Sequence, residues 1–245
     1  MLPQSPLLIA ANRDEQYDRP SAPPQLLGKE PKIIAGRDLR AGGTWLGANE
    51  HGVIAAMLNR RINSQNVAFA DARSRGLLCI DLLARRSATD AESFVRAHRA
   101  LYNPFTALVA DRHQAYVFYN AGRKLVAQEL KPGLHVFSSA AEFDLHSDKA
   151  DRAYALFGGV GEKLIRNEGE PLRMIMNLRS ALSDHSLPEG STDPGDSICV
   201  HRDNSGTVSS SIVFFSPSSA RFEMFHCAGA PCQNAFGEVV GLEVP

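Results

Sequence analysis

The stretch Leu7-Leu8-Ile9-Ala10-Ala11-Asn12-Arg13-Asp14-Glu15 decides how the rest of the chain is interpreted. Its apolar half is typical of a buried strand, and it stops abruptly at four polar residues. Polar groups gathered where a strand ends often form a site, although the same four residues could form a salt-bridged turn. The pattern alone favours this structural interpretation over a functional one.

Two further apolar segments stop at comparable polar clusters. The strand expected at 32–35 stops at Gly36-Arg37-Asp38, and the strand expected at 53–58 stops at Asn59-Arg60-Arg61. Each of the three clusters contains arginine, whose planar fork matches a carboxylate or a phosphate. Residues 1–75 also carry ten Lys/Arg against seven Asp/Glu. Small anions are therefore candidate ligands.

Composition excludes several classes of protein. The 245 residues are 44% hydrophobic and 22% charged, which is ordinary for a soluble chain and predicts one domain over 1–245. The formal net charge of -1 gives no reason to expect nucleic acid or an anionic membrane as partner, and no apolar run reaches the ~18 residues of a membrane span. Four cysteines without a signal-peptide pattern predict a reducing, cytoplasmic location.

The periodicity of apolar residues predicts strands, two helices, four strands, two helices and three strands, in that order. Prolines predict an irregular loop over 16–31, and the polar stretch 62–72 predicts another. The first helix pair is expected over 77–84 and from the capping-box pattern at Thr89 to Leu101, and the second over 149–157, stopped by Gly158, and over 171–182. The later strands are expected at 105–110, 115–119, 124–129, 134–137, 197–201, 207–215 and 221–227.

This order lacks the βαβ alternation of a doubly wound parallel sheet. Short connections between strands indicate antiparallel pairing. The prediction is an α+β fold of two stacked antiparallel sheets flanked by helices, an αββα sandwich, which would bury every apolar face of the chain.

The sequence offers little direct evidence of catalysis or metal binding. There is no Gly-x-Ser-x-Gly elbow. Cys199 and His201 lie two apart in an expected strand and could form a pair on one face, but a buried small residue beside a surface histidine is favoured. Cys227 and Cys232 indicate zinc only weakly, because no second pair stands near them. We therefore predict no catalytic residue and no metal ligand.

Other motifs also have structural explanations. The glycine runs at 42–43 and 158–161 lack the Lys-Ser/Thr of a P-loop and favour turns. The serine-rich strand around Ser209-Ser210-Ser211 favours a hydrogen-bonded sheet over a site. Trp45, the single tryptophan, is expected to pack in the core, with a pocket for a flat ligand as the alternative.

Taken together, six motifs resemble the NRDE family, also called the transport and Golgi organisation protein 2 family, over nearly the whole chain. The ordered set is far more diagnostic than any one motif. The resemblance implies a sandwich fold like that of the N-terminal-nucleophile hydrolases. The motifs are Asn12-Arg13-Asp14-Glu15 with Arg19-Pro20, Gly36-Arg37-Asp38, Gly42-Gly43-Thr44-Trp45-Leu46-Gly47, Asn59-Arg60-Arg61, Ser74-Arg75-Gly76 and Gly206-Thr207-Val208-Ser209-Ser210-Ser211.

The resemblance implies two functions. One is intracellular haem trafficking. The other is amide hydrolysis, in which a cysteine at position two becomes the N-terminus and uses its own amine as base. Here Met1 is followed by Leu2-Pro3-Gln4-Ser5-Pro6. We expect either a start upstream of Met1 or a loss of the first strand and of the chemistry that depended on it.

Three hypotheses follow. The first is a binding or trafficking protein for a small anionic metabolite, with haem as the candidate ligand. The second is the amide hydrolase, and the third is an ion-pair network that only holds the sandwich together. In the first, Arg13, Arg37 and Arg60 bind carboxylates while Asp14 and Asp38 fix the arginine forks. The predicted ligand-binding residues are Asn12, Arg13, Asp14, Glu15, Arg19, Arg37, Asp38, Trp45, Asn59 and Arg60.

Overall fold

The computed structural model describes residues 7–60, 71–122, 124–139, 148–165 and 171–245. Its strands form two antiparallel sheets. The four-stranded sheet has the order β1-β9-β10-β11, and the seven-stranded sheet runs from β2 to β8 in sequence order. The strands are β1 (Leu8–Gln16), β2 (Ser21–Leu27), β3 (Ile33–Asp38), β4 (Leu46–Asn49), β5 (Ile54–Asn59), β6 (Phe105–Ala110), β7 (Ala115–Asn120), β8 (Leu125–Glu129), β9 (Ser205–Ser216), β10 (Arg221–Cys227) and β11 (Val240–Glu243).

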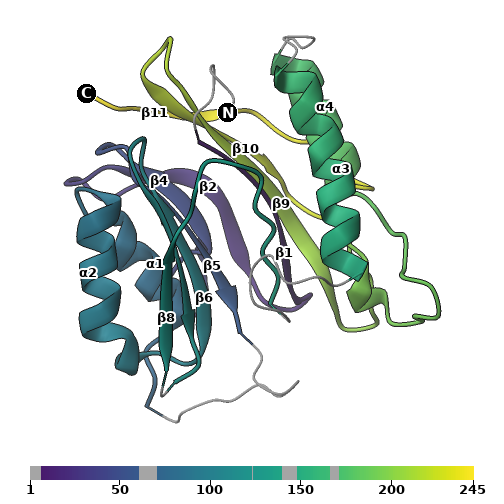
Figure 1. The fold of residues 1–245 in the computed structure, drawn as a ribbon, viewed down its shortest axis with the longest axis horizontal. Coiled ribbons are helices and arrows are strands. Elements are labelled where there is room, and N and C mark those ends of the chain that lie inside the picture. The colour runs from purple at the N-terminus through teal and green to yellow at the C-terminus, as the bar shows by residue number, and fades with distance from the viewer. Residues whose placement is uncertain (1–6, 61–70, 123, 140–147, 166–170) are drawn as a thin grey trace.

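Helices cover the outer face of each sheet (Figure 1). Helices α1 (Arg75–Leu83) and α2 (Ala88–His98) pack on the seven-stranded sheet, while α3 (Asp148–Ile165) and α4 (Pro171–Leu182) pack on the four-stranded sheet. Two short 3-10 turns, Arg99–Leu101 and Pro194–Asp196, complete the regular structure of the described residues. The predicted αββα sandwich is therefore confirmed.

The apolar residues of the strands divide between the inner and outer faces of the sheets. In β1, Ile9 and Ala11 pack between the two sheets, whereas Leu8 and Ala10 pack toward α3 and α4. This is the two-residue alternation of a strand. It predicts that Asn12 faces the helices and Arg13 faces the other sheet, so the polar motif is divided between two layers.

The prediction that the strands stop at the polar motifs is wrong for β1, whereas β3 and β5 do end within their motifs, at Asp38 and Asn59. β1 continues through Asn12 to Gln16, with a register shift between Arg13 and Asp14, and β3 continues to Asp38. The backbone of β1 stays paired because Asn12 lies opposite Ser210 and Arg13 opposite Ser209. Polar side chains end a strand only where the backbone or the side chains lack partners, and here the pairing continues.

The loop predicted over 16–31 is wrong, because β2 lies within it. Prolines were the reason for the error. β2 is the first strand in the order of its sheet, and its pairing with β3 shifts register between Ala22 and Gln25, where Pro23 and Pro24 stand. An end strand with a bulge is the place where a sheet tolerates proline.

Other boundaries also differ from the predictions. The segments 134–137 and 197–201 are not strands, while the strand β11 was not predicted. Helix α2 is capped by the Ser87 side chain, which accepts from the Asp90 N–H, and not by Thr89. Helix α3 continues past Gly158, which does not adopt the positive φ of a helix-ending glycine. Of the polar loop predicted at 62–72, residues 62–70 lie outside the described residues.

Gly43 and Gly159 provide a matched test of backbone contacts. A Cβ on Gly43 would lie 2.2 Å from the carbonyl carbon of Gly76, whereas a Cβ on Gly159 in α3 would meet no atom within 4 Å. We expect Gly43→Ala to lower the free energy of unfolding by about 1–3 kcal/mol, because the backbone at Gly76 must move to make room for the new Cβ. Gly159→Ala should raise it by about 0.5–1 kcal/mol. Chemical denaturation of both variants checks this, and equal effects would contradict the close approach at Gly43.

Candidate functional site

A large cleft of about 1770 Å³ opens between the two sheets. Its wall combines β1, the end of β3, the start of α1, α3 and the segments 129–139 and 188–206. Eight of the ten predicted ligand-binding residues line it: Asn12, Arg13, Asp14, Glu15, Arg19, Asp38, Trp45 and Asn59. The cleft is therefore the candidate site.

Arg13 connects the two sheets at the inner wall of this cleft. Its Nη2 lies 3.3 Å from Asp38 Oδ2 of β3, and its Nη1 donates to Ser21 Oγ at 3.3 Å. The guanidinium also lies over the Trp45 ring, 4.4 Å from the ring centroid. Both charged side chains of the pair are buried. A buried charge is tolerated only with such partners, so Arg13 is held in one position.

Asp38 holds a second arginine as well. Its Oδ2 accepts from Arg19 Nε at 2.7 Å, and its Oδ1 accepts the backbone N–H groups of Arg40 and Ala41 at 3.0 and 2.8 Å. Burial acts to raise the pKa of Asp38. The hydrogen bonds from Ala41 and Arg19 and the charges of Arg19 and Arg13 outweigh it, so the pKa lies below its usual value. Asp38 is therefore an anion under ordinary conditions.

Glycines allow the close packing around this pair. A Cβ on Gly36 would lie 2.7 Å from the Trp45 ring, so only glycine leaves room for the tryptophan beneath Arg13. At Gly43 the backbone touches Gly76, and the Thr44 N–H donates to the Gly76 carbonyl at 3.0 Å. The glycine motifs are therefore contact points of the backbone. The second contact places Arg75, the first residue of α1, beside the cleft.

Arg75 adds a third guanidinium to this wall. It is half-buried, and its Nη1 donates to the Pro104 carbonyl at 3.1 Å. Among the described residues no carboxylate forms an ion pair with it. Burial and the nearby charge of Arg19 lower the pKa of Arg75, with Glu15 acting in the opposite direction. We call Arg13, Arg19 and Arg75 the arginine cluster. The carboxylates beside it are Asp38 and Glu15, the latter 3.5 Å from Arg19.

Asp14 lies on another part of the cleft wall. Its Oδ1 accepts from Thr207 Oγ1 at 2.7 Å, so it does not fix an arginine fork. The carboxylate reaches solvent through the cleft, but protein atoms surround it, and this desolvation raises its pKa. The Thr207 hydrogen bond and the charges of Lys149, Arg202 and His201 act to lower it.

The remaining predicted residues have different positions. Asn12 donates to the carbonyls of Leu182 and Ile198, both at 2.9 Å, and so holds the end of α4 on β1. Arg37 is exposed, shares the outer face of β3 with Ile33 and Ala35, and is not part of the cleft wall. Arg60 lies over the Tyr119 ring at 5.0 Å, also outside the wall. The structure does not bring these two arginines to Arg13.

His226 of β10 lies on the face of the four-stranded sheet that it shares with Phe222 and Met224 between the sheets. Its Nδ1 lies 2.9 Å from Ser211 Oγ, which can donate to it. Burial and the charge of Arg13 lower the pKa of His226 to about 4. His226 therefore stays neutral at pH 7.

Sequence reasoning missed Arg75, Lys149, Arg202 and Thr207 as parts of the site. Arg75 lies in the Ser74-Arg75-Gly76 motif, and Thr207 lies in the motif that begins at Gly206. Membership of these motifs was the signal in the sequence that could have identified both residues as parts of the site. Lys149 and Arg202 carried no pattern, because they reach the cleft only through the packing of α3 and of the segment before β9.

Among the described residues, no helix is long and apolar enough to cross a membrane.

Comparison with known families shows one match across most of the chain. The model of the family described as Transport and Golgi organisation 2 matches residues 2–225. The Transport and Golgi organization 2 homolog of Mus musculus is 38% identical over 111 residues, which cover 43% of this chain and 38% of that protein. The Bos taurus homolog is 32% identical over 147 residues, covering 55% of this chain and 50% of that protein. The chain thus spans half or less of these relatives.

Solved structures show the same fold at low sequence identity. Two variant structures of conjugated bile acid hydrolase from Clostridium perfringens align with TM-scores of 0.55 and 0.53, each at 11% identity. The alignments cover 96% of this chain and 88% of those chains. At this identity the likeness concerns the fold alone.

The lowered pKa of His226 predicts an acid-dependent loss of stability. Its folded pKa of about 4 lies below the usual 6.5, so the unfolded state binds more protons between these values. The contribution of His226 to the free energy of unfolding is complete above pH 6.5 and is lost as the pH falls toward 4. The loss is at most about 3 kcal/mol. Denaturant unfolding at several pH values should show a shallower pH dependence for His226→Gln than for wild type. Parallel curves would contradict the buried neutral histidine.

Proposed function

The chain belongs to the Transport and Golgi organisation 2 family, and from this premise we propose that its cleft binds a small anionic molecule and carries it inside the cell. The observation that carries the proposal is the arginine cluster. Three guanidiniums, those of Arg13, Arg19 and Arg75, face two carboxylates, those of Asp38 and Glu15. Within this group of five side chains, the positive charges therefore exceed the negative ones by one.

The lowered pKa values of Arg13 and Arg75 support an anion as the ligand. Burial lowers both, and the repulsion from Arg19 adds to it. A carboxylate or phosphate of the ligand would relieve this repulsion and could accept a forked pair of hydrogen bonds. The preformed positions of Arg13 and Arg19 on Asp38 reduce the entropy that the protein loses on binding.

Haem is the candidate ligand that fits most of these features. It carries two carboxylates and a flat ring, and Trp45 forms part of the cleft wall beside Arg13. His113 and His135 also line the cleft, and imidazole is a common ligand of haem iron. The cleft of about 1770 Å³ exceeds the roughly 300–1,000 Å³ of ordinary small-ligand pockets, which favours a large ligand.

The proposed location is a reducing, cytoplasmic one. It is supported by four free thiols, those of Cys79, Cys199, Cys227 and Cys232.

Amide hydrolysis is the second function, and the fold shared with the bile acid hydrolase structures favours it. That reaction needs a nucleophile, a base and donors for the oxyanion. We place binding before hydrolysis for this chain because the arginine cluster, which supports binding, lines the cleft.

The proposal predicts haem binding that depends on Arg75. Titration of the purified chain with haem, followed at the Soret band, should give saturable binding. Arg75→Gln should weaken it by about tenfold, the effect of losing roughly 1.4 kcal/mol in one charge-assisted hydrogen bond. Arg75 is chosen because Arg13 and Asp38 form a buried pair whose loss would also destabilise the fold.

Arg37→Gln is the matched control. It removes the same charge from an exposed position on the outer face of β3 and should leave the affinity unchanged. Equal weakening by both variants would indicate binding through net charge alone, against the proposed site. Turnover of an acyl-amide substrate by the purified chain would instead favour the hydrolase.

A further inference from the structure

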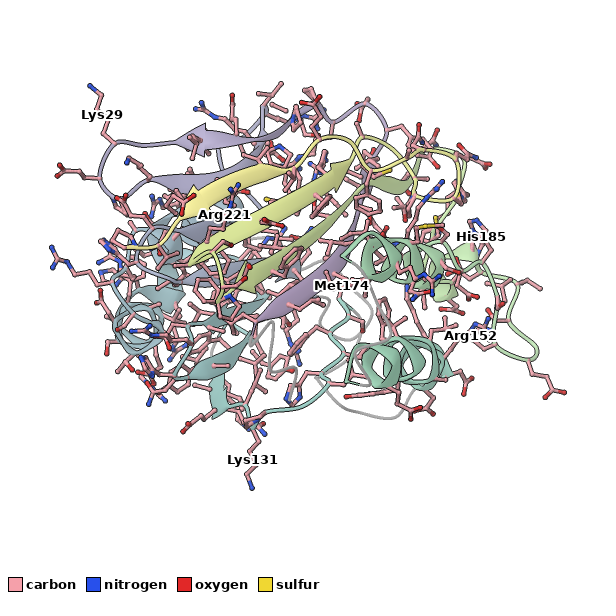
Figure 2. All side chains as sticks on the ribbon, turned by 90° about the horizontal axis from the view of Figure 1, so that it is seen from above. Lys29, Lys131, Arg152, Met174, His185 and Arg221 are labelled. Atoms are coloured by element: carbon pink, nitrogen blue, oxygen red, sulfur yellow. The ribbon has the colours of Figure 1, made fainter. Side chains whose placement is uncertain are left out.

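Four side chains with metal-binding atoms meet outside the cleft. They are His185, Cys199, His201 and Cys232, and their ligand atoms all lie within 4.8 Å of one another. The two sulfurs are 3.7 Å apart, Cys199 Sγ lies 3.7 Å from His201 Nε2, and Cys232 Sγ lies 3.3 Å from the same nitrogen. Both cysteines are free thiols. Figure 2 shows His185 at one end of the molecule, near the sulfur atoms.

These distances match the edges of a zinc coordination tetrahedron. With Zn–S bonds of about 2.3 Å and Zn–N bonds of about 2.0–2.1 Å, two sulfurs lie about 3.8 Å apart, and a sulfur and a nitrogen about 3.6 Å apart. The separations of 3.7, 3.7 and 3.3 Å lie within a few tenths of an ångström of these values. One ion at the centre could therefore contact both sulfurs and His201 with little movement.

His185 can provide the fourth ligand. Its Nδ1 lies 3.0 Å from the Cys199 carbonyl oxygen, a geometry in which Nδ1 carries the proton and donates. The lone pair is then on Nε2, on the far side of the ring. Metal-binding histidines commonly use one nitrogen for the metal and the other for such a backbone hydrogen bond. The His185 and His201 rings are 5.0 Å apart between centroids.

Separate contacts position each of the segments that carry these side chains. The Cys199 N–H donates to the Asp184 carbonyl at 2.9 Å, and His201 forms an isolated bridge with Gly206. Arg179 of α4 donates to the Pro231 carbonyl at 2.9 Å, next to Cys232. The four ligands are thus brought together by the fold itself, across the loop after α4, the approach to β9 and the turn after β10.

We propose that His185, Cys199, His201 and Cys232 form a structural zinc site. Two thiolates and two imidazoles in a tetrahedral arrangement are the donor set that zinc prefers, and four protein ligands leave no open position for a substrate. On binding, each thiol gives its proton to solvent and each sulfur forms one bond to the ion. The product carries two Zn–S and two Zn–N bonds, is electrically neutral, and requires no change of oxidation state.

The ion would clamp three segments of little regular structure onto the end of the four-stranded sheet. Two of them also reach the cleft: Pro188 and Glu189 of the loop after α4 line it, as does Arg202, which follows His201 directly. The zinc site would therefore stabilise one wall of the cleft without contacting the ligand.

The test is zinc binding by the purified chain under reducing conditions. After removal of metal with a chelator, titration with Zn²⁺ against a chromophoric competitor should give one equivalent per chain. Co²⁺ should give the visible ligand-field bands of a tetrahedral site and the near-ultraviolet thiolate charge-transfer bands. Cys232→Ser and His185→Ala should weaken zinc binding by more than the roughly 10- to 100-fold that loss of an outer-shell partner costs. Zinc should also raise the Tm of wild type and not that of Cys232→Ser.

Cys227→Ser and His51→Ala are the matched controls, because Cys227 bonds to the Gly229 and Asn234 carbonyls and His51 is exposed elsewhere. Both should bind zinc as wild type does. His185→Ala changes an exposed residue, so binding remains testable if Cys232→Ser does not fold. The proposal is overturned if wild type binds no zinc while its thiols are reduced. It is also overturned if both ligand variants bind zinc with wild-type affinity, or if the two cysteines form only a disulfide.

Discussion

The buried ion pair between Arg13 and Asp38 is the interaction around which the rest of the molecule is arranged. Arg13 belongs to the four-stranded sheet and Asp38 to the seven-stranded sheet, so their contact of 3.3 Å joins the two sheets through their polar ends. Removing two charges from water is costly, and Trp45, Ser21, Arg19 and two backbone N–H groups are the partners that offset this cost. The surrounding motifs supply these partners or leave room for them.

Most of the motifs then have a physical role. Gly36 leaves room for Trp45, and Gly43 allows the contact with Gly76 that brings Arg75 to the cleft. Asn12 holds α4, and Thr207 holds Asp14. The result is a wall that carries three arginines against two carboxylates, beside a neutral His226 whose pKa is lowered by burial and by Arg13. The same residues that stabilise the sandwich thus leave a local excess of one positive charge in this group, so the structural and functional interpretations of the motifs are compatible.

The fold class could be predicted from the sequence, because alternation in the strands and helical periodicity are local properties. The errors arose where tertiary context decides. Pro23 and Pro24 stand in a strand because β2 is at the end of its sheet, and Gly158 stands inside α3 without the positive φ that ends a helix. Arg37 and Asp38 are neighbours in the sequence, yet the alternation in β3 sends them to opposite faces. The spacing of Cys199 and His201 was visible, but their meeting with His185 and Cys232 depends on the packing of three loops.

A double-mutant cycle on Arg13→Met and Asp38→Asn tests most directly whether this pair joins the sheets. Asp38→Asn should lower the free energy of unfolding by about 3–5 kcal/mol, because it leaves the Arg13 charge buried without its carboxylate. Arg13→Met should cost less, because Asp38 keeps Arg19 and two backbone N–H donors. The double variant should lose less than the sum of the single variants, with a coupling energy of about 1–3 kcal/mol measured by denaturant unfolding. Strictly additive losses would contradict an inter-sheet ion pair as the interaction on which the cleft depends.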